Sequence, residues 1–103
     1  MFVIIWKFEV KAEHEEEFVR VYGENGDWVE LFRKAPGYMG SELHRDLQEK
    51  KQYLTIDRWN TEESYKAFRI RWAKDYERID QRCDCWTTNE QLVGLYQFCG
   101  EDT

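Results

Sequence analysis

The sequence predicts an α+β fold in which a four-stranded antiparallel sheet carries two helices on one face. Apolar residues follow the pattern of strands in four segments and recur every three or four residues in two others. The segments come in the order strand, helix, strand, strand, helix, strand. Right-handed crossovers place both helices of such a chain on the same face of the sheet.

The first strand is expected over residues 2–10, where apolar side chains load both faces and indicate a central strand. Residues 13–22 change to helical spacing, and the glycines within residues 23–26 interrupt that helix. A short second part restarts at Asp27, for which Asp27 and Glu30 are the expected capping box. Pro36 and Gly37 then turn the chain.

Residues 38–46 and 52–59 read as a hairpin closed by a polar turn at residues 48–51. Asn60 and Glu63 are the expected capping box of a second helix that runs to about residue 80. Its inner stripe is Tyr65, Phe68, Trp72, Tyr76 and Ile79, and Arg69 is assigned to another face. After an irregular stretch at residues 83–91, the last strand is expected over residues 92–98. This order is the ferredoxin-like βαββαβ topology, with the last strand at an edge.

A single copy of this fold would leave apolar surface in water. The edge strand carries Leu92, Leu95 and Phe98, and the face of the sheet without helices carries either Val3 and Ile5 or Trp6 and Phe8. Exposed apolar edges and faces promote association. We therefore expect a homodimer in which two open sheet faces stack, rather than a monomer, and a single domain over residues 1–103.

Composition limits the possible partners. The net charge of −6 disfavours nucleic acid and anionic membranes, and no apolar run is long enough to span a bilayer. The start of the chain lacks the basic region of a signal peptide. The three cysteines are odd in number, and two of them are only two positions apart, so reduced thiols in a cytoplasmic protein are expected rather than disulfides or a metal site.

Several sequence motifs can be compared with those of known families. They are the run APGYMGSELHRD at residues 35–46, the run YLTIDRW at residues 53–59, the helix with Glu63, Tyr65 and Phe68 that follows, the restart at residues 26–28, and the closing strand. Together they resemble the motifs of the antibiotic biosynthesis monooxygenase superfamily. The resemblance covers about residues 2–98. It implies a dimeric α+β barrel.

The resemblance implies several possible activities, because one fold supports many chemistries. Members include cofactor-free oxygenases of quinols and phenols, haem-degrading enzymes and proteins without known activity. The haem degraders use an Asn on the first strand and a Trp and a His on the second helix. This first strand has no Asn, and Phe68 and Arg78 occupy the two helical positions. Trp72 comes one turn late. Haem degradation is therefore set aside.

A cofactor-free oxygenase needs a base, a flat apolar pocket and exclusion of water. His44, on the second strand, and His14, in the first turn of the first helix, are the candidate catalytic bases, since they are the only histidines. An exposed surface position is the alternative for each. Nothing in the sequence calls for a metal, a flavin or a nicotinamide, so no cofactor is expected.

The candidate substrate-binding residues are aromatic, namely Tyr65, Phe68, Trp72, Tyr76 and Trp59. They would line a cavity between the sheet and the helices, and a plain hydrophobic core is the alternative. Asp57 is expected to pair with Arg45 on the neighbouring strand if it points inward.

Three functions stay open. The first is a cofactor-independent monooxygenase that acts on a small aromatic or quinol substrate. The second is a non-catalytic homodimer that binds a small apolar or aromatic ligand, or a stress-related protein. The third is a structural dimer whose cavity is filled by its own rings.

Overall fold

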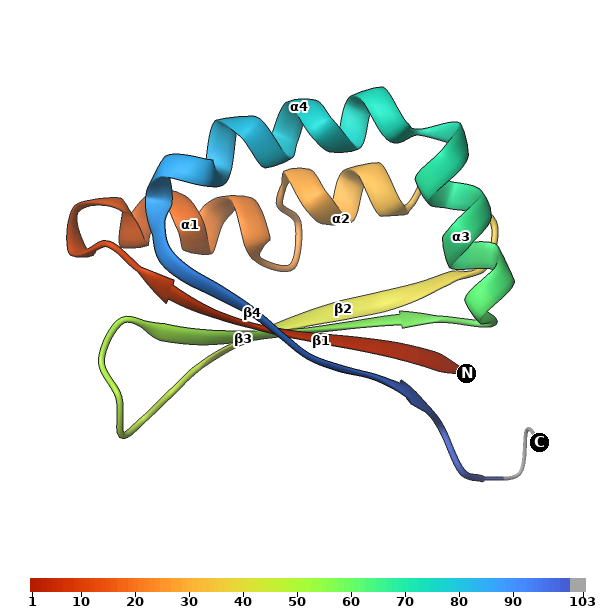
Figure 1. The fold of residues 1–103 in the computed structure, drawn as a ribbon, viewed down its shortest axis with the longest axis horizontal. Coiled ribbons are helices and arrows are strands. Elements are labelled where there is room, and N and C mark those ends of the chain that lie inside the picture. Colours follow the sequence, from red (N-terminus) through yellow and green to blue (C-terminus); the bar gives the residue numbers. More distant parts are fainter. Residues whose placement is uncertain (101–103) are drawn as a thin grey trace.

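The structure, a computed structural model, describes residues 1–100 and has the expected order of strands and helices (Figure 1). The strands are β1 (Phe2–Val10), β2 (Tyr38–Arg45), β3 (Gln52–Trp59) and β4 (Thr87–Gln97). The helices are α1 (Glu15–Tyr22), α2 (Asp27–Phe32), α3 (Glu62–Arg71) and α4 (Ala73–Cys83). Short 3-10 turns at Ala12–His14 and Asp84–Trp86 precede α1 and β4.

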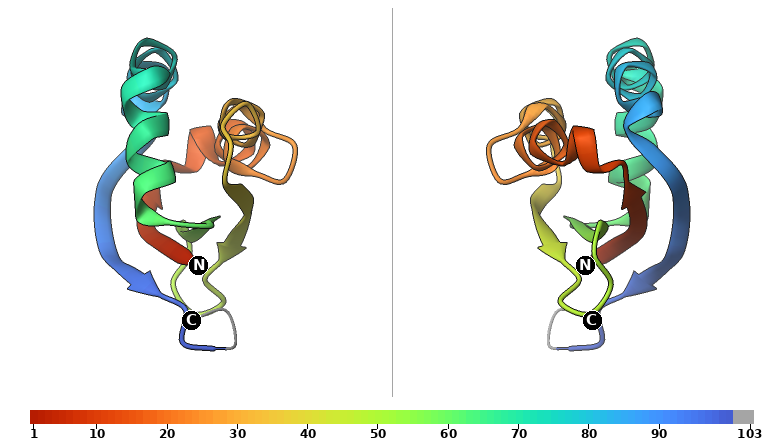
Figure 2. Two further views of the ribbon diagram at one scale, coloured as in Figure 1. Left: turned by 90° about the vertical axis from the view of Figure 1, so that its right-hand side faces the viewer. Right: turned by 90° about the vertical axis from the view of Figure 1, so that its left-hand side faces the viewer.

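The four strands form one antiparallel sheet in the order β2-β3-β1-β4. The predicted fold class is thus confirmed, with β1 and β3 central and β4 at an edge. All helices lie on one side of the curved sheet, and the two end-on views show the other side without any (Figure 2).

The core lies between the sheet and the helices because side chains alternate along the strands. Phe2, Ile4, Phe8 and Val10 of β1 face the helices and are buried. On β3, Tyr53 and Trp59 do the same, and Trp59 is completely inaccessible to solvent. The rings of Trp59 and Phe68 lie 5.1 Å apart between centroids, which joins the sheet to α3. This packing fixes the helices over the sheet.

Both expected capping boxes are wrong. The N-cap of α3 is Thr61, whose side chain accepts a 3.0 Å hydrogen bond from the Ser64 backbone N–H. Thr61 has the extended backbone that an N-cap requires, while Asn60 accepts a bond from the Ser64 hydroxyl instead. The N-cap of α2 is Gly26, and the Asp27 carboxylate pairs with Arg82 of α4.

The expected second helix is two helices, because helical backbone geometry is interrupted at Trp72. This residue has φ −108° and ψ 31°, outside the helical region. Its backbone N–H still donates to the Phe68 carbonyl at 2.9 Å. The break turns α4 away from the direction of α3, so that α4 runs above α1 and α2 (Figure 1). One end of the molecule is therefore covered by α3 and the length of the sheet by α4.

Strand β4 begins five residues earlier than predicted, at Thr87. Its polar first half pairs with the end of β1, with Asn89 opposite Glu9 and Thr87 opposite Val10. An edge strand tolerates polar side chains because one edge faces water. Its second half exposes large apolar side chains, with 44% of Leu92 and 52% of Leu95 accessible to solvent.

Candidate active site

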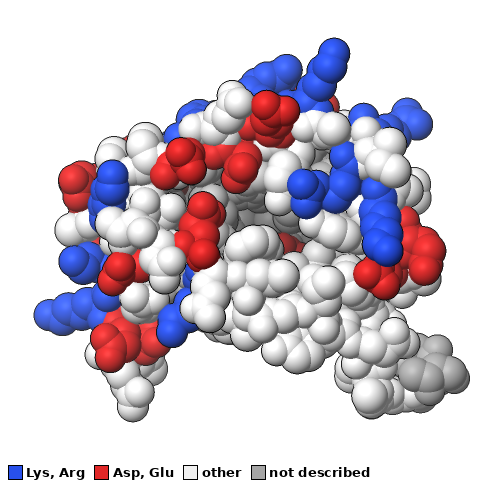
Figure 3. All heavy atoms as spheres, viewed as in Figure 1, with Lys and Arg blue, Asp and Glu red and all other residues white. Residues whose placement is uncertain are grey.

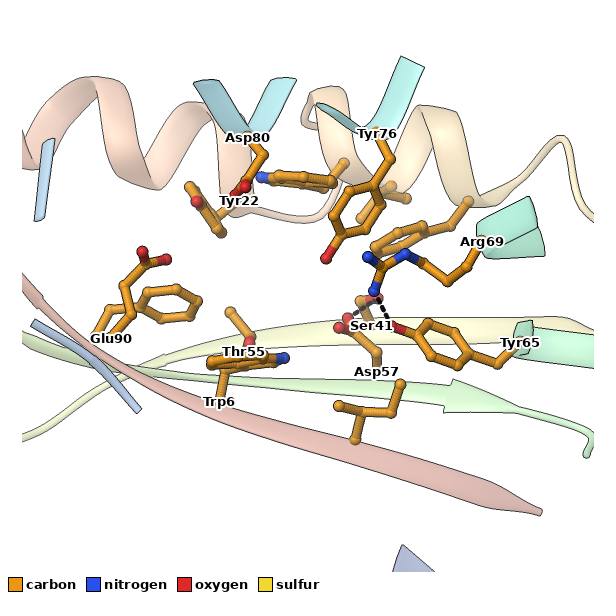
Figure 4. Close-up of a pocket in the computed structure, with 15 residues that line it drawn as sticks. Trp6, Tyr22, Ser41, Thr55, Asp57, Tyr65, Arg69, Tyr76, Asp80 and Glu90 are labelled. Atoms are coloured by element: carbon orange, nitrogen blue, oxygen red, sulfur yellow. Dashed lines mark hydrogen bonds between the residues drawn. The ribbon is translucent and has the colours of Figure 1, made fainter. Parts of the chain in front are cut away.

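A cavity of about 300 Å³ lies between the helix-bearing face of the sheet and the helices above it. Seven of its 15 lining residues are aromatic. Figure 4 shows the 15 residues that line it: Ile4, Trp6, Phe8, Tyr22, Trp28, Val29, Phe32, Ser41, Thr55, Asp57, Tyr65, Arg69, Tyr76, Asp80 and Glu90. Such a lining, with a few polar groups among aromatic rings, is typical of small-molecule sites.

The mouth of the cavity opens beside β4 and carries opposite charges on its two sides. The space-filling view shows a hollow with acidic side chains on one side and basic ones on the other (Figure 3). Asp80 of α4 and Glu90 of β4 belong to the acidic side, and Arg69 of α3 belongs to the basic side. Among the lining residues in the described part of the chain, Arg69 is the single Lys or Arg.

Asp57 is an acidic group inside the cavity. It follows the helix-facing alternation of β3 and lies opposite Ser41 of β2. The Ser41 hydroxyl donates a 2.6 Å hydrogen bond to Asp57 Oδ1 and accepts a 2.7 Å bond from the Tyr38 hydroxyl. This chain of two hydrogen bonds orients the carboxyl group, while no ion pair to Asp57 is present within residues 1–100.

The environment of Asp57 changes its acidity. Burial disfavours the charged form and raises the pKa from 3.8 to about 6, against the opposing effect of the Ser41 hydrogen bond. A carboxyl group with this pKa is a carboxylate at neutral pH and can still take up a proton readily. These are the properties of a general base.

Arg69 is held in place by two tyrosines. Its Nη1 donates a 2.8 Å hydrogen bond to the Tyr65 hydroxyl, and its guanidinium carbon lies 3.9 Å from the centroid of the Tyr76 ring. Burial raises the pKa of the Tyr76 hydroxyl, so Tyr76 stays protonated. Figure 4 shows the polar ends of Tyr65, Tyr76 and Arg69 turned toward the end of the cavity that holds Asp57.

The opposite end of the cavity is acidic. Burial raises the pKa of both Asp80 and Glu90, and the repulsion between carboxylates adds to it. The Tyr22 hydroxyl and the Trp28 indole lie at this end. The indole N–H is buried and makes no hydrogen bond of normal geometry within residues 1–100.

The antibiotic biosynthesis monooxygenase family model matches residues 1–71, which is more than half of the chain and includes β1, β2, β3 and α3. The chain belongs to this family. Membership supports a monooxygenase-type function but specifies no substrate. No curated protein sequence matches the chain.

Solved structures share the fold of this family member at low sequence identity. SnoaB, a cofactor-independent oxygenase from Streptomyces nogalater, has a TM-score of 0.69 at 17% identity, over 97% of this chain and 94% of SnoaB. A conserved protein from Methanosarcina mazei has a TM-score of 0.76 at 15% identity, over 93% of this chain and 90% of that protein. At these identities the likeness shows the fold alone.

Neither histidine of this family member lines the cavity. His44 lies on the helix-free face of the sheet, half exposed, with Nε2 2.8 Å from a Glu42 carboxylate oxygen. His14 precedes α1, with Nδ1 3.0 Å from a Glu17 carboxylate oxygen and its ring stacked on Trp86. Their catalytic roles stay predictions, and the contacts of both imidazoles are those of surface side chains.

The five predicted aromatic residues separate into three groups. Tyr65 and Tyr76 line the cavity. Phe68 and Trp59 belong to the buried core. Trp72 lies at the break between α3 and α4, beside a separate surface groove that it shares with Phe68, Arg71 and Lys34. The predicted stripe is therefore partly site and partly core.

The expected ion pair between Asp57 and Arg45 is wrong. The hairpin register places Arg45 opposite Tyr53, and the Arg45 guanidinium donates 3.3 Å hydrogen bonds to the Tyr53 hydroxyl. The Tyr53 hydroxyl in turn donates to Glu15 at 2.8 Å. Ser41 is the partner of Asp57 instead. Counting residues outward from the turn between β2 and β3 would have identified it.

The helical spacing predicts Arg69 on an outer face, but Arg69 lines the cavity. The reason is its stacking on Tyr76, which belongs to α4 and is brought close by the break at Trp72. The spacing of residues in the sequence does not reveal the contact between Arg69 and Tyr76, because the predicted apolar stripe continues across the break at Trp72.

Other classes of site find no support in residues 1–100. No group of three or more His, Cys, Asp or Glu side chains is arranged to hold a metal ion there. Within the same residues, no helix is long and apolar enough to cross a membrane. The three cysteines are free, with Cys83 buried and Cys85 and Cys99 exposed.

Proposed function

We propose that this protein is a cofactor-independent monooxygenase of a small phenol or hydroquinone, with Asp57 as the general base. The observation that carries the proposal is a partly buried carboxyl group with a pKa of about 6, without a cationic partner in the described residues, inside a cavity lined in part by aromatic rings. Perturbed acidity inside a cleft is a marker of functional sites.

The reaction begins with proton transfer from the phenol O–H to the Asp57 carboxylate. The phenolate is electron-rich enough to give one electron to O₂, which forms a substrate radical and superoxide. The two combine at a ring carbon that bears hydrogen, and the proton held by Asp57 passes to the peroxide. Cleavage of the O–O bond and loss of the ring hydrogen then give a quinone and one water, so that each product takes one atom of O₂.

The walls of the cavity suit such a substrate. Trp6 and Phe8 of β1 lie below it, with ring centroids 6.3 Å apart, and Trp28 and Phe32 of α2 lie above it. Flat aromatic surfaces bind planar rings and exclude water from reactive intermediates. The volume is near the lower end of the range for ligand pockets, about 300–1,000 Å³, which favours a substrate of one or two rings.

Oxygen uptake tests the function. The purified protein is incubated with hydroquinones and naphthols, with and without a metal chelator, and O₂ consumption is followed against buffer. We expect chelator-independent consumption with at least one substrate and the quinone as product. Binding of these compounds without consumption above buffer would contradict the proposal and favour a non-catalytic binding protein.

We further propose that the protein is a homodimer. On the helix-free face of the sheet, Ile5 of β1 lies opposite Ile56 of β3, and the apolar side chains of Val3 and Leu54 lie diagonally on either side of this pair. This apolar surface and the exposed half of β4 would be covered by a second copy. His44 lies on the same face. Sedimentation equilibrium should give twice the mass of one chain, and the mass of a single chain at micromolar concentration would contradict the proposal.

A further inference from the structure

We propose that Arg69 and Tyr65 form an anion site that binds the ionised oxygen of the phenol, so that the cavity holds its ligand as a phenolate. The inference rests on the proposed phenolic substrate. It assigns to these two residues the role of stabilising the charge that appears when Asp57 takes the proton.

The contacts of Tyr65 leave its proton available. Its hydroxyl accepts a hydrogen bond from Arg69 Nη1 at 2.8 Å, and the described residues provide no acceptor for its own O–H. A hydroxyl that accepts from a guanidinium becomes a stronger donor, because hydrogen bonds in a chain polarise one another. Tyr65 can therefore donate to a ligand oxygen in the cavity that it lines.

Arg69 is fixed before any ligand binds. The guanidinium lies 3.9 Å from the centroid of the Tyr76 ring and 5.9 Å from that of Tyr65. It forms no ion pair in residues 1–100. A cation that is oriented in advance and lacks a counter-ion stabilises an anion with little reorganisation.

Asp57 and Arg69 have separate roles in the proposed proton transfer: Asp57 takes the proton, and Arg69 stabilises the anion that remains. Both line one cavity without pairing with each other, and Figure 4 shows Asp57, Tyr65 and Arg69 directing polar atoms toward the same end. When the phenol O–H bond breaks, the proton goes to Asp57 and the phenolate oxygen accepts from the Tyr65 O–H. The positive charge of Arg69 balances the new negative charge.

The test measures ionisation of a bound phenol and needs no oxygen chemistry. Para-nitrophenol is the probe, because its phenolate absorbs at longer wavelength than its neutral form. Its absorbance is titrated against pH on the wild-type protein and on the variants Arg69→Gln, Tyr65→Phe and Asp57→Asn. Arg78→Gln is the matched control, since Arg78 is an exposed arginine of α4 outside the cavity.

Arg69→Gln is expected to lower the ratio of bound phenolate to bound phenol by about tenfold at a given pH, and Tyr65→Phe to lower it by less. Asp57→Asn is expected to raise the ratio, since a neutral amide replaces a carboxylate that repels the phenolate. Arg78→Gln should match the wild type.

Equal ionisation of the probe on the Arg69→Gln and Arg78→Gln variants would overturn the inference, as would failure of the wild-type protein to bind the probe. The inference and the proposed function can fail separately. Ionisation of the probe without O₂ uptake by any substrate would contradict the monooxygenase and keep the anion site. O₂ uptake by the wild-type protein, together with a probe titration that does not depend on Arg69, would contradict the anion site and keep the monooxygenase.

Discussion

Replacing Asp57 by asparagine is expected to lower the rate of oxygen uptake by about 10²–10⁴-fold, the usual contribution of a general base. The amide keeps the shape of the carboxyl group, and its oxygen can still accept the Ser41 hydrogen bond. It cannot take a proton from the substrate. The loss should therefore appear in kcat with little change in substrate binding.

The same substitution should stabilise the protein at neutral pH. Burial raises the pKa of Asp57 above its value in the unfolded chain, so the carboxylate form is disfavoured in the folded state. The wild type therefore loses stability as the pH rises from about 4 through 6, and the full cost is present above 6. A pKa that rises from 3.8 to about 6 corresponds to about 3 kcal/mol, which Asp57→Asn would recover at pH 8 but not at pH 4. Urea unfolding at the two pH values measures the difference.

Two histidine variants are the controls for this experiment. His44→Gln and His14→Gln remove the other titratable candidates, whose imidazoles lie outside the cavity. We expect both to keep most of the oxygen uptake and to show no gain in stability above pH 6. If the Asp57→Asn variant were as active as the wild type and the His44→Gln variant were inactive, the results would identify His44 as the base instead of Asp57.

Trp59→Ala is expected to destabilise the protein by about 3–5 kcal/mol, the range for deletion of a buried aromatic side chain. Trp59 is completely inaccessible to solvent, and its ring contacts those of Phe32, Tyr38, Tyr65 and Phe68. Its removal would leave a cavity where β3, α2 and α3 meet. Urea denaturation monitored by circular dichroism gives the free energy of unfolding.

Two other substitutions serve as comparisons for the destabilisation by Trp59→Ala. Trp59→Phe should cost much less than Trp59→Ala, since it keeps a ring and removes a buried indole N–H that has no hydrogen-bond partner in the described part of the chain. Trp72→Ala should also cost less, because Trp72 is only partly buried. Equal destabilisation by Trp59→Ala and Trp72→Ala would contradict the packing described for the core.

The central strands were the most predictable part of the fold. Both β1 and β3 have the predicted bounds, because each combines β-branched and aromatic residues at alternating positions and is followed by polar residues. The start of β4 could not be predicted in this way. Its residues 87–91 are polar, and they become a strand only through backbone pairing with β1, a long-range contact that leaves no local pattern.

The site was less predictable than the fold. Tyr65 and Tyr76 were identified from the helical stripe, but the break at Trp72 carries neither Gly nor Pro and was not anticipated. That break brings the Tyr76 ring against the Arg69 guanidinium, which holds this cation in the cavity. The sequence favours the histidines as bases because the ordinary pKa of an imidazole is near neutrality. The acidity of Asp57 depends on burial, which the sequence alone does not show.

A shared fold does not determine the chemistry of a protein, so the function depends on the side chains in the cavity. Family membership supports a monooxygenase-type function for the chain, while the choice of base and anion site belongs to individual side chains on a shared scaffold. Asp57 on β3 and Arg69 on α3 are the two charged groups at one end of the cavity. Their separate substitution tells whether the proposed chemistry belongs to this chain.

The acidity of Asp57 is the quantity on which the account depends, and carboxyl-carbon NMR measures it directly. The protein is labelled with ¹³C at aspartate carboxyl groups, and the Asp57 resonance is assigned by its loss in the Asp57→Asn variant. We predict a titration midpoint at about pH 6, well above the ordinary aspartate pKa. A midpoint at or below the ordinary value of about 3.9 would show a solvated carboxylate and contradict the account.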